Sequence, residues 1–236
     1  MENKIFLLGI GFNNLSLDEV LEFIKKGLSK SEKKYYVVTP NPEILTISKK
    51  DEDYKKVLNG AKLALADGIG VLFASKILGK PLKEVIHGVD LTEMLCREVS
   101  KQPITVGFLG AGPHVAELTA ECLREKYPDL KINFTTEEWD FKKEYPKTDI
   151  LFVAFGSPKQ EFWIAQNLDK LPVRVAIGVG GAFDFISGKV RRAPKLIQKL
   201  ELEWLFRLVL QPKRIRRQLR LIEFIFLVFK EKWYNK

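Results

Sequence analysis

The stretch DILFVAFGSPKQ, residues 149–160, decides how the rest of the chain is interpreted. Its first half is a continuous apolar run, which is typical of a strand buried on both faces of a sheet. A Gly-Ser-Pro turn follows, and a helical pattern then covers 161–171. Strand, turn and helix in this order predict one unit of a parallel α/β sheet.

The same alternation extends over the chain on both sides. Further apolar runs predict strands within 4–12, 35–43, 63–70, 103–113, 131–136 and 173–188. Helical patterns lie over 16–30, from about Pro42, and over 88–101 and 114–128. In the first of them, Ser16 and Glu19 have the spacing of a capping box. Together these elements predict an α/β fold with a Rossmann-like, mainly parallel sheet flanked by helices.

Length and cysteine content narrow the class of protein. A chain of 236 residues suffices for one large domain, or for one domain with an appendage. Cys96 and Cys122 have no ligand spacing, so we expect buried apolar residues in a reducing compartment. The first residues lack a signal-peptide pattern, and no stretch reaches the roughly 20 apolar residues that span a bilayer. We therefore expect a cytoplasmic protein.

Charge is distributed unevenly along the chain. The net charge is +9, but residues 189–236 contain 14 Lys and Arg against four Glu, a balance of +10. Residues 1–188 contain 25 basic and 26 acidic side chains, a balance of −1. A near-neutral body with a basic tail indicates an anionic surface as partner. We predict an α/β body over 1–194 and a basic amphipathic helical appendage over 195–236.

The tail has the pattern of a membrane-binding segment. One helix is predicted over 192–211 and a second from Pro212 onward. One basic stripe on the second is formed by Lys213, Arg217 and Arg220. The apolar run FIFLVF follows at 224–229, and such a helix lies on an anionic membrane without crossing it. Packing against the body, a dimer interface and RNA binding are alternatives; exposed Phe and Ile disfavour nucleic acid.

Chemically distinctive residues follow the predicted strands. Ligands of parallel sheets bind at the carboxyl ends of the strands. Five such ends carry Gly or Pro, at 39–41, 66–68, 110–113, 156–160 and 178–181. Glycine is also the default residue of such turns, but five loops along one rim favour a phosphate-bearing ligand contacted by backbone N–H groups. The glycines predicted to bind substrate are Gly110, Gly112, Gly180 and Gly181.

A dinucleotide-binding fingerprint is incomplete in this sequence. Gly110 and Gly112 have the G-x-G spacing, but Val115 stands where a third glycine or alanine belongs. No strand-terminal acid follows about 20 residues later to bind a ribose. A nucleotide phosphate cradle is therefore favoured over an NAD-dependent oxidoreductase.

Asp67 is the candidate general base. The stretch LALADGIG, residues 63–70, places a carboxylate at the end of a buried strand, beside glycines, where a substrate hydroxyl has access. The alternative is that Asp67 only caps a turn or the next helix, as Asp-Gly often does.

Polar residues on neighbouring loops are candidates for substrate binding. Thr39 and Asn41 offer neutral groups suited to sugar hydroxyls, or else form local turns between prolines. Gln160 is placed to contact a sugar or a base edge, or else is an exposed residue in the first turn of a helix. Asp184 lies among apolar residues and is either functional or a cap.

No metal site and no other cofactor are predicted. Residues 51–53 have the D-x-D form of many metal-dependent sugar-nucleotide enzymes, but they lie among lysines on a predicted helix and not at a strand end. They therefore indicate a solvated helix face. His87 and His114 are single histidines without ligand partners in the sequence.

Six motifs follow one another along the chain: TPNPE (39–43), LADGIG (65–70), HGVDL (87–91), GSPKQE (156–161), GVGGAFDFISGKVRRAP (178–194) and LEWLFRLVLQPKR (202–214). In this order they resemble the WecG/TagA/CpsF glycosyltransferases, over nearly the whole chain. The resemblance implies transfer of N-acetylmannosamine from its UDP derivative (UDP-ManNAc) to the 4-hydroxyl of undecaprenyl-diphosphate-linked N-acetylglucosamine (GlcNAc). It implies inversion at the anomeric carbon, no required metal, and a role in the linkage unit of wall teichoic acid.

The resemblance also assigns roles to residues. Asp67 takes the position of the base, and Thr39 and Asn41 take pocket positions. Gln160 is expected near the donor. The arginines expected to neutralise diphosphate are Arg214, Arg217 and Arg220.

One motif departs from the family pattern. The family usually has Arg-x-x-Gly-x-Asp, whereas VIHGVD here places Val85 at the arginine position. If that arginine contacts phosphate, another cation must replace it, either His87 or an arginine of the tail. The departure affects the choice of donor more than the class of reaction.

The implied partners are a UDP-sugar, polyprenyl-diphosphate-linked GlcNAc and an anionic membrane surface, with no nucleic acid. The protein is expected to be peripheral on the inner face of the cell membrane, and a homo-oligomer is an open possibility. Two alternatives are retained. One is another donor, either the uronic acid form UDP-ManNAcA or a UDP-hexose. The other is a non-catalytic nucleotide- or lipid-binding module.

Overall fold

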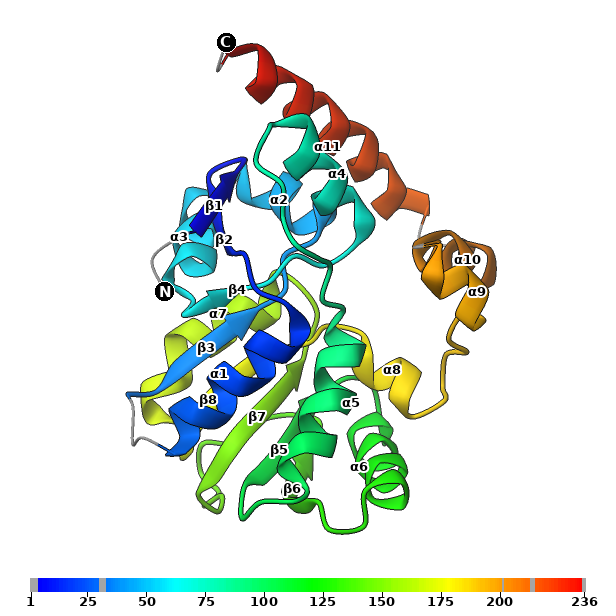
Figure 1. Ribbon diagram of the computed structural model, residues 1–236. Helices are drawn as coiled ribbons and strands as arrows, with labels where there is room; N and C mark the ends of the chain where they lie inside the picture. Colours follow the sequence, from blue (N-terminus) through cyan, green and yellow to red (C-terminus); the bar gives the residue numbers. More distant parts are fainter. Residues whose placement is uncertain (1–3, 30–32, 201, 213–214, 235–236) are drawn as a thin grey trace.

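The computed structural model describes residues 4–29, 33–200, 202–212 and 215–234. Its centre is a six-stranded sheet in the order β4-β3-β8-β7-β5-β6, and every strand pair in it is parallel. The strands are β3 (Tyr35–Val38), β4 (Leu63–Ala64), β5 (Thr105–Gly110), β6 (Lys131–Thr136), β7 (Thr148–Ala154) and β8 (Val173–Gly178). The predicted α/β fold is confirmed (Figure 1).

Helices cover both faces of the sheet. In β7, Ile150 and Phe152 pack with the helices of one face, whereas Leu151 and Val153 pack with those of the other. The first face is covered by α1 (Leu17–Ser29), α5 (Gly88–Val99), α6 (Val115–Lys126) and α8 (Ala182–Ile186). The second face is covered by α7 (Lys159–Asn167) and the 3₁₀ helix η1 (Leu168–Lys170). Burial on both faces explains why the strand sequence is continuously apolar.

Two expectations for the start of the chain have opposite outcomes. The single strand predicted over 4–12 is wrong, because β1 (Lys4–Leu7) and β2 (Ile10–Asn13) form a separate antiparallel hairpin. Its tip residues, Leu8 and Gly9, have positive φ angles of 51° and 86°, as a two-residue hairpin turn requires. The capping box of α1 is confirmed: Ser16 N donates to Glu19 Oε2 at 2.7 Å, and Glu19 N donates to Ser16 Oγ at 3.2 Å.

A second apolar core lies beyond the carboxyl ends of β3 and β4. It combines the hairpin with α2 (Pro42–Ser48), α3 (Glu52–Gly60), α4 (Ile69–Ile77) and α11 (Ile215–Tyr234). Helix α11 runs along α2 and α4 (Figure 1). Its Phe224 and Val228 are 3% and 2% exposed. The end of the chain therefore completes a core of the body.

Within the described residues, the first of the two helices predicted for the tail is interrupted. The helix expected over 192–211 is divided into α9 (Lys195–Lys199) and α10 (Glu203–Leu210), whereas the separation around Pro212 is confirmed. Arg192 binds Asp90 of α5 at 2.7 Å and Glu203, the first residue of α10, at 3.3 Å, which ties the start of α10 to the body. Within the described ranges, no helix is long and apolar enough to cross a membrane.

Candidate active site

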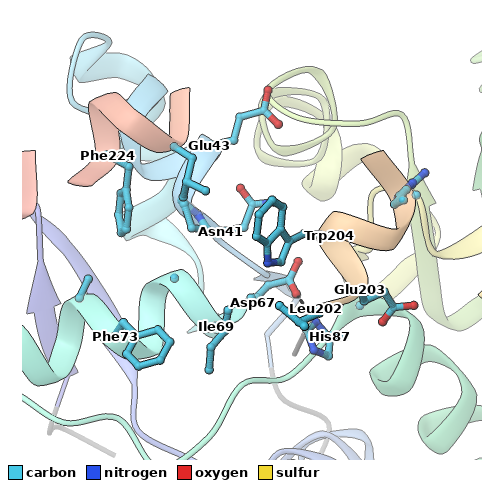
Figure 2. Close-up of a pocket in the computed structure, with 18 of the residues that line it drawn as sticks. Asn41, Glu43, Asp67, Ile69, Phe73, His87, Leu202, Glu203, Trp204 and Phe224 are labelled. Carbon is cyan, nitrogen blue, oxygen red and sulfur yellow. Dashed lines mark hydrogen bonds and ion pairs between the residues drawn. The ribbon is translucent and has the colours of Figure 1, made fainter. Parts of the chain in front are cut away.

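A cavity of about 1070 Å³ lies between the carboxyl ends of the strands and the helices of the tail. Its wall combines the loops that follow β3, β4 and β8 with residues of α4, α10 and α11 (Figure 2). Its polar side chains from the body include Asn41, Glu43, Asp67 and His87, and Trp204 and Arg207 line it from α10. Residues that are far apart in the sequence therefore share one site.

The backbone holds Asp67 at a defined position on the rim. Beyond β4 the chain stays extended, because Leu65 N donates to Val38 O at 2.9 Å and Asp67 N donates to Pro40 O at 3.1 Å. Gly68 then has a φ of +83° and begins α4. These contacts place the carboxylate on the cavity wall.

His87 is the partner of Asp67. It precedes the first turn of α5, and its Nδ1 lies 2.7 Å from Asp67 Oδ1. Both side chains are about one quarter exposed, at 24% and 25%. Since an ionised carboxylate only accepts hydrogen bonds, His87 Nδ1–H donates to it. The sequence offered His87 as a cation for phosphate; the structure places it beside the candidate base.

Thr39 and Asn41 have different surroundings. Asn41 lines the cavity, and its Oδ1 accepts from Ile44 N at 3.0 Å, so it also caps α2. Thr39 is 6% exposed and donates to Gly178 O at 3.2 Å, which joins the ends of β3 and β8. Thr39 is not among the described residues that line the cavity.

Gln160 is a buried connector. It is 1% exposed, which excludes the alternative of an exposed helix residue. Its amide donates to Glu161 Oε1 at 2.7 Å and accepts from Gly180 N at 3.0 Å. Glu161 is fully buried and also accepts from Ser157 Oγ at 2.7 Å and Tyr54 Oη at 3.0 Å. Burial, followed by the charge of Glu161, raises the pKa of Tyr54 well above its ordinary value.

The four predicted glycines are divided between two regions. Gly181 lines the cavity. Gly180 precedes it in the chain, and its N–H donates to Gln160 Oε1. Gly110 has a φ of +104°, and a Cβ there would be 2.9 Å from the Phe155 ring. Gly112 faces Lys189, whose Nζ is 3.2 Å from the position of a Cβ. Neither Gly110 nor Gly112 is among the described residues that line the cavity.

The tail arginines named from the sequence are only partly described. Arg214 and the side chain of Arg217 lie outside the described residues. Arg220 forms an ion pair with Glu43 at 2.5 Å, and Glu43 lines the cavity.

Sequence reasoning missed Arg207. Its guanidinium nitrogens lie 3.0 Å from the position of a Cβ on Gly181. The same group lies 4.6 Å from the centre of the Phe185 ring and 3.4 Å from Asp184 Oδ2. A single charge in the apolar stretch WLFRLVL (204–210) was the available signal.

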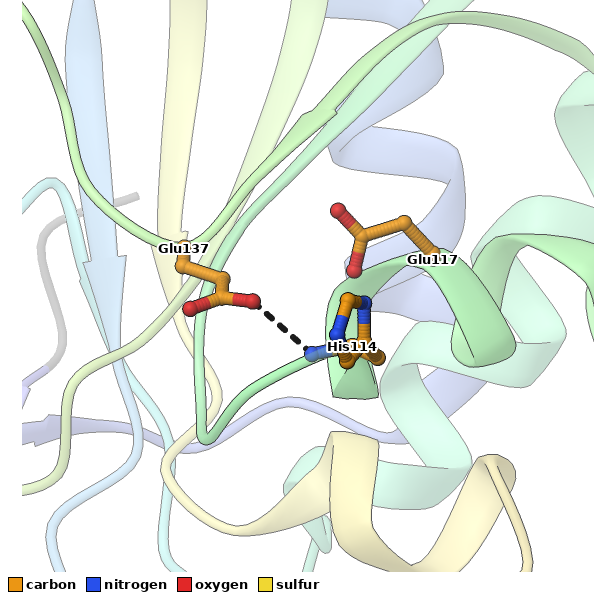
Figure 3. A group of neighbouring side chains, drawn as sticks. All are labelled: His114, Glu117 and Glu137. Atoms are coloured by element: carbon orange, nitrogen blue, oxygen red, sulfur yellow. Dashed lines mark hydrogen bonds between the residues drawn. The ribbon is translucent and has the colours of Figure 1, made fainter.

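A group of three side chains with metal-ligand atoms lies elsewhere on the rim (Figure 3). Ligand atoms of His114, Glu117 and Glu137 are all within 4.8 Å of one another, a proximity that the sequence did not suggest. Glu137 already accepts from His114 N at 2.8 Å, which gives it a role at the start of α6.

Residues 51–53 lie at the start of α3. Asp51 caps this helix, because its side chain accepts from Tyr54 N at 2.9 Å.

The sequence over residues 5–236 matches the family model described as glycosyl transferase WecG/TagA/CpsF. The chain belongs to this family. An N-acetylglucosaminyldiphosphoundecaprenol N-acetyl-beta-D-mannosaminyltransferase of Bacillus spizizenii is 36% identical over 202 residues, which cover 83% of this chain and 79% of the relative. The protein of the same name from Staphylococcus aureus strain MRSA252 is 32% identical over 237 residues, 97% of this chain and 93% of the relative.

Membership of the WecG/TagA/CpsF family makes this protein a glycosyltransferase. The resemblance drawn from the six motifs is thereby confirmed. The family match extends through α11, so the helices that complete the second core and the cavity belong to the enzyme as the family defines it.

Proposed function

We propose that the protein transfers N-acetylmannosamine from UDP-ManNAc to the 4-hydroxyl of GlcNAc that is linked through diphosphate to a polyprenyl lipid, with inversion. Two relatives that align with most of the chain are named for a mannosaminyl transfer to N-acetylglucosaminyldiphosphoundecaprenol, which supports the acceptor. The observation that carries the proposal is the Asp67 carboxylate on the cavity wall, paired with His87.

In this proposal Asp67 is the general base. It accepts the proton of the acceptor hydroxyl while that oxygen forms a bond to the anomeric carbon of the donor. The bond between the anomeric carbon and the diphosphate oxygen breaks, and UDP leaves from the opposite face of the sugar. His87 Nδ1–H donates to one oxygen of the Asp67 carboxylate and thereby orients it. The other oxygen is then directed toward the acceptor hydroxyl and accepts its proton.

The leaving diphosphate requires positive charge and N–H donors. The strand order reverses between β7 and β5, since the chain leaves β5 toward β6 and leaves β7 toward β8. Ligands of open α/β sheets bind at such a point, so the loops with Gly110 and Gly112 are suited to the nucleotide. Lys189 lies over this region and Arg207 lies over Gly181, and both would stabilise the departing charge. No metal is part of this scheme.

The tail would bring the enzyme to a lipid-borne acceptor. Residues of α11 that expose apolar surface include Ile222, Phe226 and Trp233, at 67%, 65% and 79%. Basic and apolar groups on one helix favour reversible binding to an anionic membrane surface, here the inner face of the cell membrane.

The test is UDP release from UDP-ManNAc with and without a GlcNAc-diphospholipid, repeated with UDP-ManNAcA and UDP-hexoses. Release that requires both UDP-ManNAc and the acceptor supports the proposal, and preference for another donor would replace the sugar assignment. A chelator such as EDTA is expected to leave the rate unchanged. Loss of activity that added divalent metal restores would contradict the metal-free scheme and direct attention to His114, Glu117 and Glu137.

A further inference from the structure

The cavity has two chemically unlike ends. Around Asp67 it presents the polar groups described above. Away from them it becomes an apolar groove between α4 and α11, which contribute Phe73 and Ile77 on one side and Ile225 and Phe229 on the other. Figure 2 shows Phe73 and Phe224 in the same cavity wall as Asp67. The groove is therefore continuous with the proposed reaction site.

The groove is open although its lining is apolar. Phe224 and Val228 are buried in its floor, but Phe73, Ile225 and Phe229 remain 57%, 49% and 46% exposed. An apolar ligand that covers exposed apolar surface of this kind removes it from water, which lowers the free energy of the complex. The cavity volume of about 1070 Å³ also slightly exceeds the roughly 300–1,000 Å³ of small-molecule sites, and it is more than one sugar needs.

We propose that this groove binds the first isoprene units of the acceptor's polyprenyl chain. The inference rests on the proposed function and extends it, because it assigns a place to the hydrocarbon next to the diphosphate. In the sequence of α11, which begins at Ile215, positions 216, 217 and 220 are arginines, and the residues that line the cavity follow from Leu221 onward. A molecule that joins a diphosphate to a hydrocarbon matches that order of charge and apolar surface.

The exposed stripe of α11 beside the groove shows that membrane binding alone does not account for the groove. Ile222 and Phe226 are exposed but are not among the described residues that line the cavity. A membrane surface would cover these residues. It would not fill a groove whose floor is Phe224 and Val228, which pack into the body. Two neighbouring stripes of one helix would therefore have different partners, the bilayer for one and a single chain drawn from it for the other.

Direct binding of a short prenyl diphosphate to the full chain tests this assignment. The probe is geranylgeranyl diphosphate below its micellar concentration, without vesicles or detergent, and isothermal titration compares it with inorganic diphosphate. Tighter binding of the prenyl compound is expected. Phe73→Ala and Phe229→Ala should each raise its Kd about tenfold, since a half-exposed aromatic ring loses its ligand contact. The matched control is Phe226→Ala, on the neighbouring stripe of α11 and not among the described residues that line the cavity, with less than a twofold change expected.

Equal affinity for the two diphosphates, or equal effects of the three substitutions, would overturn the inference. A dimer that Phe229→Ala dissociates, without prenyl binding, would assign the groove to a second copy of the chain and also overturn it. The proposed reaction fails separately: prenyl binding that is lost in Phe229→Ala, together with no transfer from any UDP-sugar, would retain the groove and reject the reaction. Circular dichroism of each variant shows whether it is folded.

Discussion

The two halves of the sheet rim carry similar loops but have different roles in the structure. The loops after β4, β3 and β8 open onto the cavity with Asp67, Asn41 and Gly181. The loops after β7 and β5 also carry glycine and proline, yet none of their described residues lines the cavity. A glycine-rich strand end therefore does not by itself identify the reacting centre. The difference comes from the tail, because α10 and α11 enclose only the first half.

The largest effect is expected from Asp67→Asn, which removes the base and preserves the size of the side chain. We expect the rate of transfer to fall by about 10²–10⁴-fold with the fold intact, as measured by acceptor-dependent UDP release. Asp53→Asn is the control, since this acid is exposed on α3 and pairs with Lys56. A folded Asp67→Asn enzyme with most of its turnover would move the chemistry away from this half of the rim.

His87→Ala should have the next largest effect on catalysis. Loss of a hydrogen bond to a charged group costs about 1.5–3 kcal/mol, which corresponds to roughly 10- to 100-fold in kcat. The KM for the donor should stay unchanged, because His87 binds Asp67 on the half of the rim away from the loops where we propose the donor.

His87→Asn is the conservative variant, since its amide can donate from nearly the position of Nδ1. It should recover part of the rate lost in His87→Ala. Equal rates for the two variants would mean that the hydrogen bond to Asp67 does not matter for positioning the base.

Gln160→Ala tests the connection between the halves. Gln160 lies in the first turn of α7, which follows β7. Its side-chain oxygen accepts from the N–H of Gly180, which follows β8. Its removal leaves Gly180 N and buried Glu161 with one partner fewer, so unfolding should become easier by about 1–3 kcal/mol. Thermal unfolding measures this, with Gln166→Ala on the exposed side of α7 as control. Equal melting temperatures for the two variants would contradict a connecting role.

Sequence patterns predicted what is local. The apolar run before Gly156 required burial on both faces, and Ser16 with Glu19 required a helix start; both are found. The position of Asp67 at a strand end followed in the same way.

What depended on distant contacts could not be predicted. His87 contacts Asp67 across 20 residues, and Arg207 lies over Gly181 from a helix whose first residue, Glu203, pairs with Arg192. The periodicity of apolar residues does not predict contacts between side chains that are far apart in the sequence. The hairpin at Leu8 was missed for a local reason, since leucine rarely adopts the positive φ of its turn.

The smallest effect is expected in the half of the rim outside the cavity. Lys189 is exposed and lies over Gly112, where we propose the donor diphosphate. An exposed ion pair contributes about 0.2–1 kcal/mol, so Lys189→Met should raise the KM for UDP-ManNAc by about twofold to fivefold and leave the KM for the acceptor unchanged. Lys131→Met, at the opposite end of β6, is the control. A higher KM for the acceptor instead would place the lipid diphosphate on these loops, and the two halves of the rim would then exchange their assigned substrates.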